Sequence, residues 1–167
     1  MSQRTRILIA VLILVVLVGA ILGIDALRRR SSPTPADAPV VLEAGSIPIY
    51  VNGTLAAGFT PDDLAELEQV SFVDAEEGKT QEGWLLRDVL LLHLAQRDLD
   101  PDTLVTVIST SRDKSAQLTW AEVDDPANSV MFDLSGRGTL KLVSLLERLD
   151  VRDEWIQDVD KIEVVNQ

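Results

Sequence analysis

Cysteine is absent from this chain of 167 residues. Its absence excludes disulfide bonds, thiolate chemistry, cysteine-ligated metals and lipidation at a lipobox cysteine. Histidine is nearly absent as well, since His93 is the only one. A metal site built from two imidazoles is therefore excluded, and no G-x-S-x-G motif accompanies His93 to indicate a serine hydrolase. The sequence offers no set of residues that makes a nucleophile.

The few other candidates for catalysis or metal binding have simpler interpretations. His93 lies on the apolar side of an expected helix, which is typical of a packed residue at the edge of the core. The acids of segment 98–102 (DLDPD) alternate as in a calcium loop, but Thr103 replaces the expected glycine and Ser109 the expected glutamate. We interpret that segment as a polar connection. We expect no catalytic residue and no metal ligand.

Positive charge is scarce and unevenly distributed. The chain has 15 Lys and Arg against 27 Asp and Glu. Five of the arginines and two of the aspartates lie in residues 1–39, so residues 40–167 carry 10 basic and 25 acidic side chains and a net charge of −15. Such a surface repels nucleic acid and anionic headgroups. Nucleic acid is therefore not expected as a partner.

One long apolar run stands out among what the sequence does contain. Residues 7–24, from Ile7 to Ile24, read ILIAVLILVVLVGAILGI, eighteen apolar residues without a charge. At about 1.5 Å per residue they span roughly 27 Å of hydrocarbon, where a helix satisfies its own backbone. A cleaved signal peptide, the alternative, usually has an apolar region of about 7–15 residues before a small-x-small site. Because residues 36–38 (ADA) lie too far downstream for such a site, we predict an uncleaved transmembrane helix after a short tail at residues 1–6.

Two opposing signals bear on the orientation of this anchor. Arg4 and Arg6 precede the run, whereas residues 28–30 are three arginines with Asp25 nearby. Counted alone, the arginines slightly favour a cytoplasmic C-terminal side. A very short tail before one helix and a folded domain is, however, the usual layout of a bacterial signal anchor with an exported domain. We predict a single-pass protein of the cell membrane with an extracytoplasmic domain, in which residues 28–30 fix the helix end rather than recognise a particular lipid.

A linker separates the anchor from the domain. Residues 25–39 are first charged and then Pro-rich, and the segment 31–39 (SSPTPADAP) has three prolines and no bulky apolar residue. This composition favours an extended spacer. Residues 40–167 form a stretch of 128 residues with globular composition, close to the commonest domain size. We therefore expect one domain.

Periodicity and turn signals predict more strands than helices in this domain. Thr60, followed by a proline and two acids, predicts a helix start. A strongly amphipathic helix is expected over 84–96, with Leu92 widening its apolar face. Strands are expected at 47–51, 70–73, 80–84, 104–110, 116–120, 130–134, 140–143 and 161–165. Hairpins dominate the connections, which predicts an α+β domain with mixed, mostly antiparallel sheets and few helices.

Three tryptophans begin or end expected elements. Trp84, Trp120 and Trp155 are in positions typical of core anchors, with Trp120 on a strand beside Leu118. The alternative, a platform for a sugar or a partner, requires at least one of them to be exposed.

The order of several segments resembles a known family. These segments are VNG at 51–53, FTPDDLAEL at 59–67, residues 83–110, LTWAEV at 118–123, VMFDL with GTLKLV within 130–143, and WIQDVDKIEVV at 155–165. Over about 115 residues they resemble the molybdopterin-binding domain of sulfite-oxidase-type oxidoreductases. They are similar to that family's first hairpin, FTLEDL helix, G-V-P-L-x-D-L-L helix, central strand pair, G-P-L-R-L strand and closing strand. The resemblance implies the fold of that family.

The departures from the family pattern bear on chemistry. Enzymes of that family hold molybdenum through a cysteine, and the matching region, residues 73–83, has none. The D-G-Y-S turn of the family is replaced by residues 112–115 (RDKS), and its H-G-x-P-L-R segment by residues 135–141 (SGRGTLK), which puts Lys141 at the position of the family arginine. Because a soft metal needs the thiolate, molybdenum-dependent catalysis is not expected, and neither is a cofactor.

Four cations remain as candidates for a binding site. If Arg112, Lys114, Arg137 and Lys141 meet in one concave pocket, they would suit a pterin or another anion, and if they scatter they would not. Residues 136–138 (GRG) are either a plain turn or a nest of backbone N–H groups for an anion.

The sequence therefore predicts a membrane-anchored, non-catalytic domain that acts by binding a protein or small-molecule partner. One alternative is an oxidoreductase-like protein that retains a pterin or molybdopterin cofactor through cations and a non-thiolate ligand. This alternative predicts a deep pocket that holds Arg137 or Lys141 beside residues 73–83. The other is a structural subunit that recruits a redox partner to the membrane.

Overall fold

The computed structural model describes residues 41–96 and 99–166. The predicted tail, transmembrane helix and linker, residues 1–39, lie outside the described residues, and so does the orientation that depends on them. Within the described part of the chain, no helix has the length and apolar character needed to cross a bilayer.

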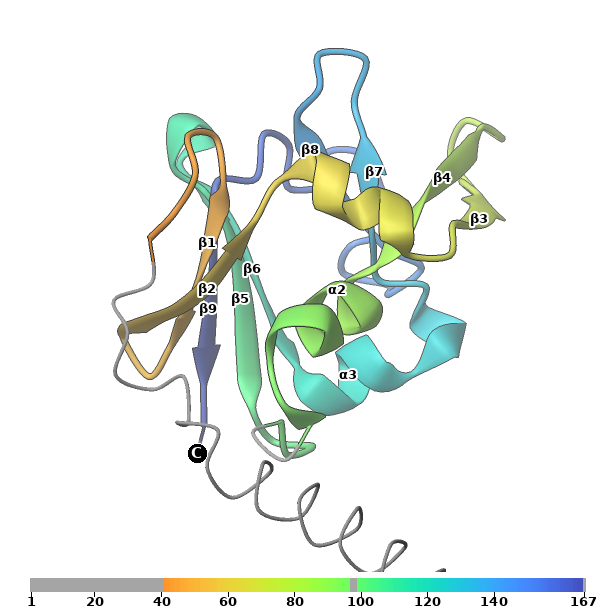
Figure 1. The fold of residues 1–167 in the computed structure, drawn as a ribbon. Helices are drawn as coiled ribbons and strands as arrows, with labels where there is room; N and C mark the ends of the chain where they lie inside the picture. The colour runs from red at the N-terminus through yellow and green to blue at the C-terminus, as the bar shows by residue number, and fades with distance from the viewer. Residues whose placement is uncertain (1–40, 97–98, 167) are drawn as a thin grey trace, which may run out of the picture. The chain divides into compact units, whose positions relative to one another are not determined.

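The larger of two sheets has five strands in the order β2-β1-β9-β5-β6 (Figure 1). The strand β9 lies between β1 and β5, so the end of the chain forms the middle of the sheet. It runs parallel to β1 and antiparallel to β5. The bounds are β1 (Ile47–Val51), β2 (Thr54–Phe59), β5 (Leu104–Ser109), β6 (Lys114–Thr119) and β9 (Lys161–Val165).

The smaller sheet has four antiparallel strands in the order β3-β4-β7-β8. Gly83 lies opposite Asp133 where β4 meets β7, and a Cβ at Gly83 would collide with the carbonyl oxygen of Phe132. Glycine therefore permits the close approach of these two strands. The bounds are β3 (Val70–Val73), β4 (Thr80–Leu85), β7 (Met131–Leu134) and β8 (Leu140–Val143).

Short helices connect the strands. The helix α3 begins with a reciprocal cap, in which the Thr119 N–H donates to the Glu122 carboxylate at 2.8 Å and the Glu122 N–H to the Thr119 hydroxyl at 3.3 Å. The α-helices are α2 (Leu86–His93) and α3 (Trp120–Asp124), and the 3₁₀ helices are η2 (Pro61–Glu66), η4 (Thr110–Arg112) and η5 (Pro126–Asn128).

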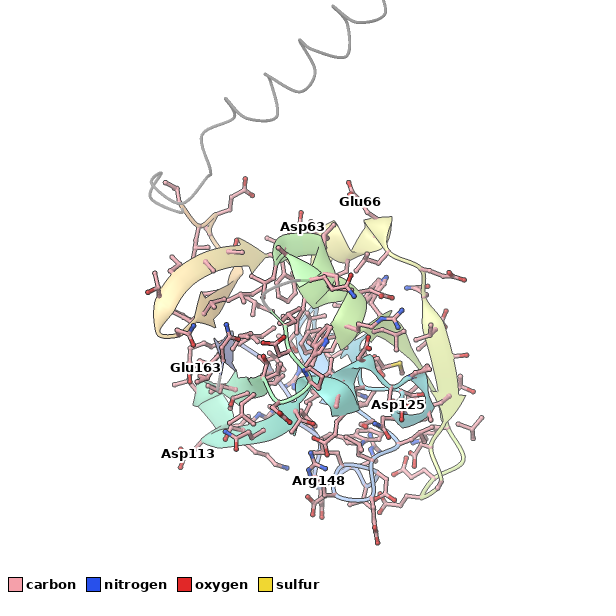
Figure 2. All side chains as sticks on the ribbon, turned by 90° about the horizontal axis from the view of Figure 1, so that it is seen from below. Asp63, Glu66, Asp113, Asp125, Arg148 and Glu163 are labelled. Carbon is pink, nitrogen blue, oxygen red and sulfur yellow. The ribbon has the colours of Figure 1, made fainter. Side chains whose placement is uncertain are left out.

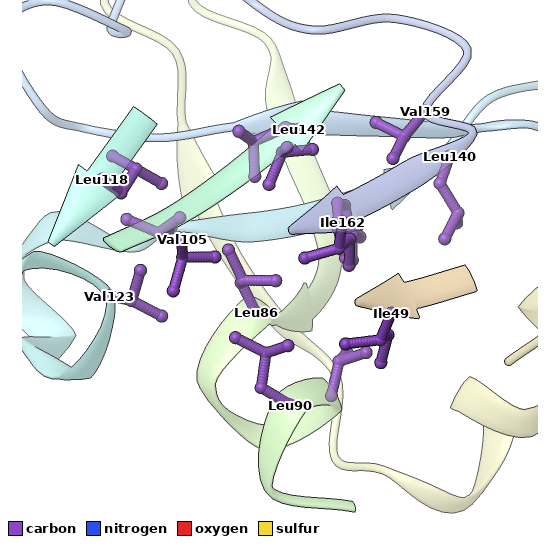
Figure 3. Close-up of a cluster of buried hydrophobic side chains, with 14 of the residues drawn as sticks. Ile49, Leu86, Leu90, Val105, Leu118, Val123, Leu140, Leu142, Val159 and Ile162 are labelled. Atoms are coloured by element: carbon purple, nitrogen blue, oxygen red, sulfur yellow. The ribbon is translucent and has the colours of Figure 1, made fainter. Parts of the chain in front are cut away.

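The main core lies between the two sheets and α2 (Figure 3). Leu86 and Leu90 of α2 point toward Ile49 and Ile162 of the larger sheet, and all four are fully buried. The smaller sheet contributes Phe132, Leu140 and Leu142. Each such side chain stabilises the fold by about 1.5–3 kcal/mol relative to an exposed one.

A second, smaller cluster covers the other face of the smaller sheet. Met131, Val143 and Trp155 form it, with Val70 and Phe72 packed against them. A bridge between Leu142 and Ile156 pairs the chain around Trp155 with β8. This packing fixes the segment 152–158, which carries the residues described below.

The predicted fold class is confirmed at the level of an α+β domain with mostly antiparallel sheets and few helices. Every predicted strand is present, with ends that differ by at most two residues. The helix expected over 84–96 is shorter at both ends: it begins at Leu86 because Trp84 and Leu85 pair with β7, and it ends at His93, since Leu94 is extended. Leu92, expected on its apolar face, is 43% exposed. Trp120 does not end a strand but begins α3, although it is buried as expected.

Candidate functional site

A hollow at the end of the β5–β6 hairpin brings cations together. We call it the Trp155 cavity. It has a volume of about 210 Å³ and is lined by Arg112, Lys114, Arg152, Asp153, Trp155 and Gln157. Two of the four cations selected from the sequence, Arg112 and Lys114, therefore line one cavity.

Trp155 is the buried residue of the cavity lining. Its side chain is only 1% exposed, and the indole N–H donates to the carbonyl of Leu149 at 3.0 Å. Trp84 and Trp120 are also buried, at 6% and 5% exposed. The prediction that the three tryptophans are core anchors is confirmed, since a stacking platform would need an exposed ring.

Asp158 holds two arginines at the edge of the cavity. Its Oδ2 accepts from Arg112 Nε at 2.8 Å and Nη2 at 2.7 Å, and its Oδ1 lies 3.3 Å from Arg137 Nη2. The Thr139 hydroxyl donates to the same Oδ1 at 2.8 Å. The bond from Thr139 and then that from Arg112 hold the pKa of Asp158 below its usual range. Arg137 is thus joined to the cavity through Asp158 although it does not line it.

The backbone at Asp158 is unusual. Its φ is +56°, in the left-handed region that non-glycine residues rarely adopt. The hydroxyl of Ser109, which is fully buried, donates to the Asp158 carbonyl at 2.9 Å. The strained conformation is therefore held from both the backbone and the carboxylate, and it aims the carboxylate at the two arginines.

The other two cavity cations are also held in place. The Lys114 ammonium donates to the backbone oxygen of Asp153. Arg152 Nη1 pairs with Glu77 Oε1 at 2.6 Å, and its guanidinium carbon lies 5.9 Å from the centre of the Trp155 ring. The bond to Glu77 raises the pKa of Arg152. The β3–β4 turn is thereby tied to the cavity.

Lys141, the fourth candidate, has a different environment. Its ammonium contacts Asp133 Oδ2 and Gln81 Oε1, each at 3.0 Å, and lies 4.7 Å from the centre of the Trp155 ring. Its side chain is 16% exposed. Lys141 therefore packs against the Trp155 ring and does not line the cavity.

The loop at 136–138 is a turn whose donors are used locally. The N–H of Gly138 donates to the Ser135 carbonyl at 2.9 Å, and the N–H groups of Arg137 and Thr139 donate to the Ser135 hydroxyl at 3.4 and 3.3 Å. Of the two interpretations of this segment, the plain turn agrees with this geometry.

Residues 73–83, where the resemblance would expect the molybdenum ligand, contain no thiolate for a soft metal. Of residues 73–83, Asp74 is buried, but its Oδ1 accepts from the Glu76 and Glu77 N–H groups at 2.7 and 3.3 Å within a turn. No thiolate exists anywhere in the sequence, and among the described residues no three His, Asp or Glu side chains are grouped to hold a metal. A soft metal has no suitable donor set here.

His93 lies beside a second hollow of about 300 Å³, which also includes Asp63 and Glu43. Its ring stacks on Phe59 with centroids 5.7 Å apart, and burial lowers its pKa although Asp63 opposes the shift. Figure 2 shows Asp63 on η2 at the outer edge of the domain. The stacking on Phe59 agrees with the interpretation of His93 as a packed residue at the edge of the core.

Four residues of the site were missed by sequence reasoning: Arg152, Asp153 and Gln157, which line the cavity, and Asp158 at its edge. Arg152 belongs to no motif, and Asp158 lies in the segment WIQDVDKIEVV, where the resemblance points to a strand rather than to a site. Comparison with known proteins adds no assignment: no family model matches the chain, and no curated protein matches it.

Proposed function

We propose that this chain is a membrane-anchored, non-catalytic domain of the sulfite-oxidase-type molybdopterin-binding fold that binds an anionic ligand or partner group in the Trp155 cavity. Residues 7–24 anchor it as a single-pass protein of the cell membrane, and residues 25–39 hold the domain away from the bilayer on the extracytoplasmic side.

The convergence of Arg112, Lys114 and Arg152 on one small cavity carries this proposal. Arg112 and Lys114 come from one hairpin turn, and Arg152 comes from a distant segment, in a domain of net charge −15. Charge-assisted hydrogen bonds to an oxyanion are stronger than neutral ones. Asp158 and Glu77 already orient Arg112 and Arg152. These side chains therefore lose little conformational entropy when a ligand binds.

The size of the cavity favours a small ligand. A volume of about 210 Å³ corresponds to the liquid volume of about seven water molecules and lies below the range of drug-sized pockets. The lining consists of cations, one acid, an amide and an indole, which bind and orient but include no imidazole or thiol. A lining of this kind suits the binding of a small anion.

The experiment is a titration of the full-length protein in non-ionic detergent with inorganic phosphate, followed by calorimetry at low salt. We expect the double variant Arg112→Gln, Lys114→Gln to bind about tenfold more weakly, in line with loss of charged hydrogen bonds. The single variant Lys114→Gln provides the same test if the double variant does not fold.

Arg148→Gln is the matched control. Arg148 projects from the edge of the domain (Figure 2), where both of its terminal nitrogens lie 2.7 Å from the Glu122 carboxylate, outside the cavity. Its loss is expected to leave phosphate affinity unchanged. Equal affinity of wild type and the Lys114→Gln variant would contradict the proposal.

The alternative, an oxidoreductase-like protein that retains a pterin or molybdopterin cofactor without cysteine, shares the cluster of cations. It differs in needing Arg137 or Lys141 in a pocket beside residues 73–83, and Lys141 is already committed to Asp133 and Gln81. Stoichiometric molybdenum in protein purified from its native host would favour this alternative over a binding function.

A further inference from the structure

The Trp155 cavity contains one acid that is not used to hold a cation. Asp153 lines the cavity, and its backbone oxygen accepts from the Lys114 ammonium. Among residues 41–96 and 99–166, its carboxylate forms no ion pair and accepts no hydrogen bond. Asp158 and Glu77, in contrast, each hold one of the cations that line the cavity.

This carboxylate is a disadvantage for a purely anionic ligand. A negative charge in the lining repels an anion. It therefore lowers the affinity for a purely anionic ligand relative to one that also carries a positive group. Asp153 is exposed and does not stabilise the core, and although its backbone oxygen holds Lys114, its carboxylate pairs with no cation of the described residues. A ligand with a positive group that meets this carboxylate turns the repulsion into an attraction.

We infer that the ligand of the Trp155 cavity is a small zwitterion, with an oxyanion at one end and an ammonium group at the other. Arg112, Lys114 and Arg152 receive the oxyanion, and Asp153 receives the ammonium group. The Gln157 amide, which donates and accepts hydrogen bonds, suits the polar middle of such a molecule.

Net charge agrees with this assignment. Arg112, Lys114, Arg152 and Asp153 give the lining a charge of +2, and Asp158 and Glu77, which pair with Arg112 and Arg152, bring the sum of these six side chains to zero. A zwitterion, whose opposite charges offset each other, fits this balance better than a purely anionic ligand. The inference rests on the proposed function, because it specifies the ligand of the same cavity.

The test compares two probes that differ by one ammonium group, 3-aminopropylphosphonate and propylphosphonate. Both are titrated into the full-length protein in non-ionic detergent. We expect the aminated probe to bind about fivefold more tightly, which is the upper end for an exposed ion pair. In the variant Asp153→Asn this preference should disappear while propylphosphonate binds at least as well as before.

Glu154→Gln is the control, since Glu154 is an exposed neighbouring acid that does not line the cavity, and it should keep the preference. If wild type binds propylphosphonate as tightly as the aminated probe, the zwitterion inference is overturned and the anion site stands. If neither probe nor phosphate binds, the proposed function is overturned as well.

Discussion

At the scale of single residues, Asp158 does the most to arrange the candidate site. Its carboxylate accepts from Arg112 and Thr139 and lies close to Arg137, and its carbonyl accepts from Ser109. Its left-handed backbone, with φ of +56°, is a conformation that aspartate adopts more readily than most residues, and these contacts hold it there. The geometry of Arg112 therefore depends on the charge of Asp158.

This dependence predicts how stability changes with pH. The folded-state pKa of Asp158 is lowered, so its contribution is fully present above the ordinary carboxyl pKa of about 3.9 and is lost as pH falls through the folded value. We expect Asp158→Asn to lower the free energy of unfolding by about 1–2 kcal/mol at pH 7, as for hydrogen bonds to a charged group. The difference from wild type should shrink below about pH 4.

Urea unfolding of the full-length protein in detergent, followed by tryptophan fluorescence, measures this effect. Asp113→Asn is a close control, because Asp113 is also left-handed, with φ of +50°, and is exposed. Asparagine tolerates this conformation, so both variants keep the backbone. A pH-independent difference between wild type and Asp158→Asn would argue against an ionised Asp158 as the source of stability.

Residue identity alone could not reveal this site. Arg112 and Lys114 were found because they replace residues of a family turn, whereas Arg152 and Asp158 come from a region without a motif. Lys141 was selected by the same resemblance, but its ammonium is taken up by Asp133 and Gln81. Which cations face a common hollow depends on long-range packing around Trp155, and local pattern carries no information about that packing.

At the scale of elements, the approach of β4 to β7 determines where the smaller sheet lies. Gly83 is the residue that allows it, because any Cβ there meets the backbone of Phe132. Phe132 belongs to the main core, and its neighbour Met131 packs against Trp155 on the other face. A shift between these strands would thus disturb both hydrophobic clusters.

We therefore expect Gly83→Ala to destabilise the fold by about 1–3 kcal/mol, the usual cost of overpacking. The comparison is Gly136→Ala, where no atom lies within 4 Å of the added Cβ and φ is not positive. That variant should be close to wild type. The midpoint of urea unfolding measures both, and a stable Gly83→Ala protein would mean that β4 and β7 separate without loss.

Local sequence patterns predicted most strands. They gave the wrong start for α2, where strand pairing overrides the helical pattern, and they missed α3, whose capping residues were overlooked. Strands such as β3 and β9 agree with their predicted bounds because alternation and turn residues mark both ends. The start of α2 was displaced because Trp84 and Leu85 complete a ladder with β7. The helix α3 was missed although Thr119 and Glu122 stand at the spacing of a capping box.

At the scale of the whole molecule, charge is divided along the chain. Residues 1–39 carry five arginines and two aspartates, whereas residues 40–167 have a net charge of −15. Anionic headgroups would repel a domain of this charge. The net negative charge of the domain also repels an anionic ligand. Binding in the Trp155 cavity therefore requires that the nearby cations attract the anion more strongly than the more distant acids, which are screened by salt, repel it.

The predicted orientation decides which compartment supplies the ligand. If the domain is exported, protease added to intact spheroplasts should cut the linker at 25–39 and release a fragment detected by an epitope added after Gln167.

Cytoplasmic marker proteins must stay intact in the same sample, and detergent lysis must make the linker cleavable in either orientation. Protection of the epitope-bearing chain in intact spheroplasts would place the domain in the cytoplasm, as the three arginines at 28–30 alone would favour. The ligand would then be a cytoplasmic solute, and the chemistry inferred for the Trp155 cavity would be unchanged.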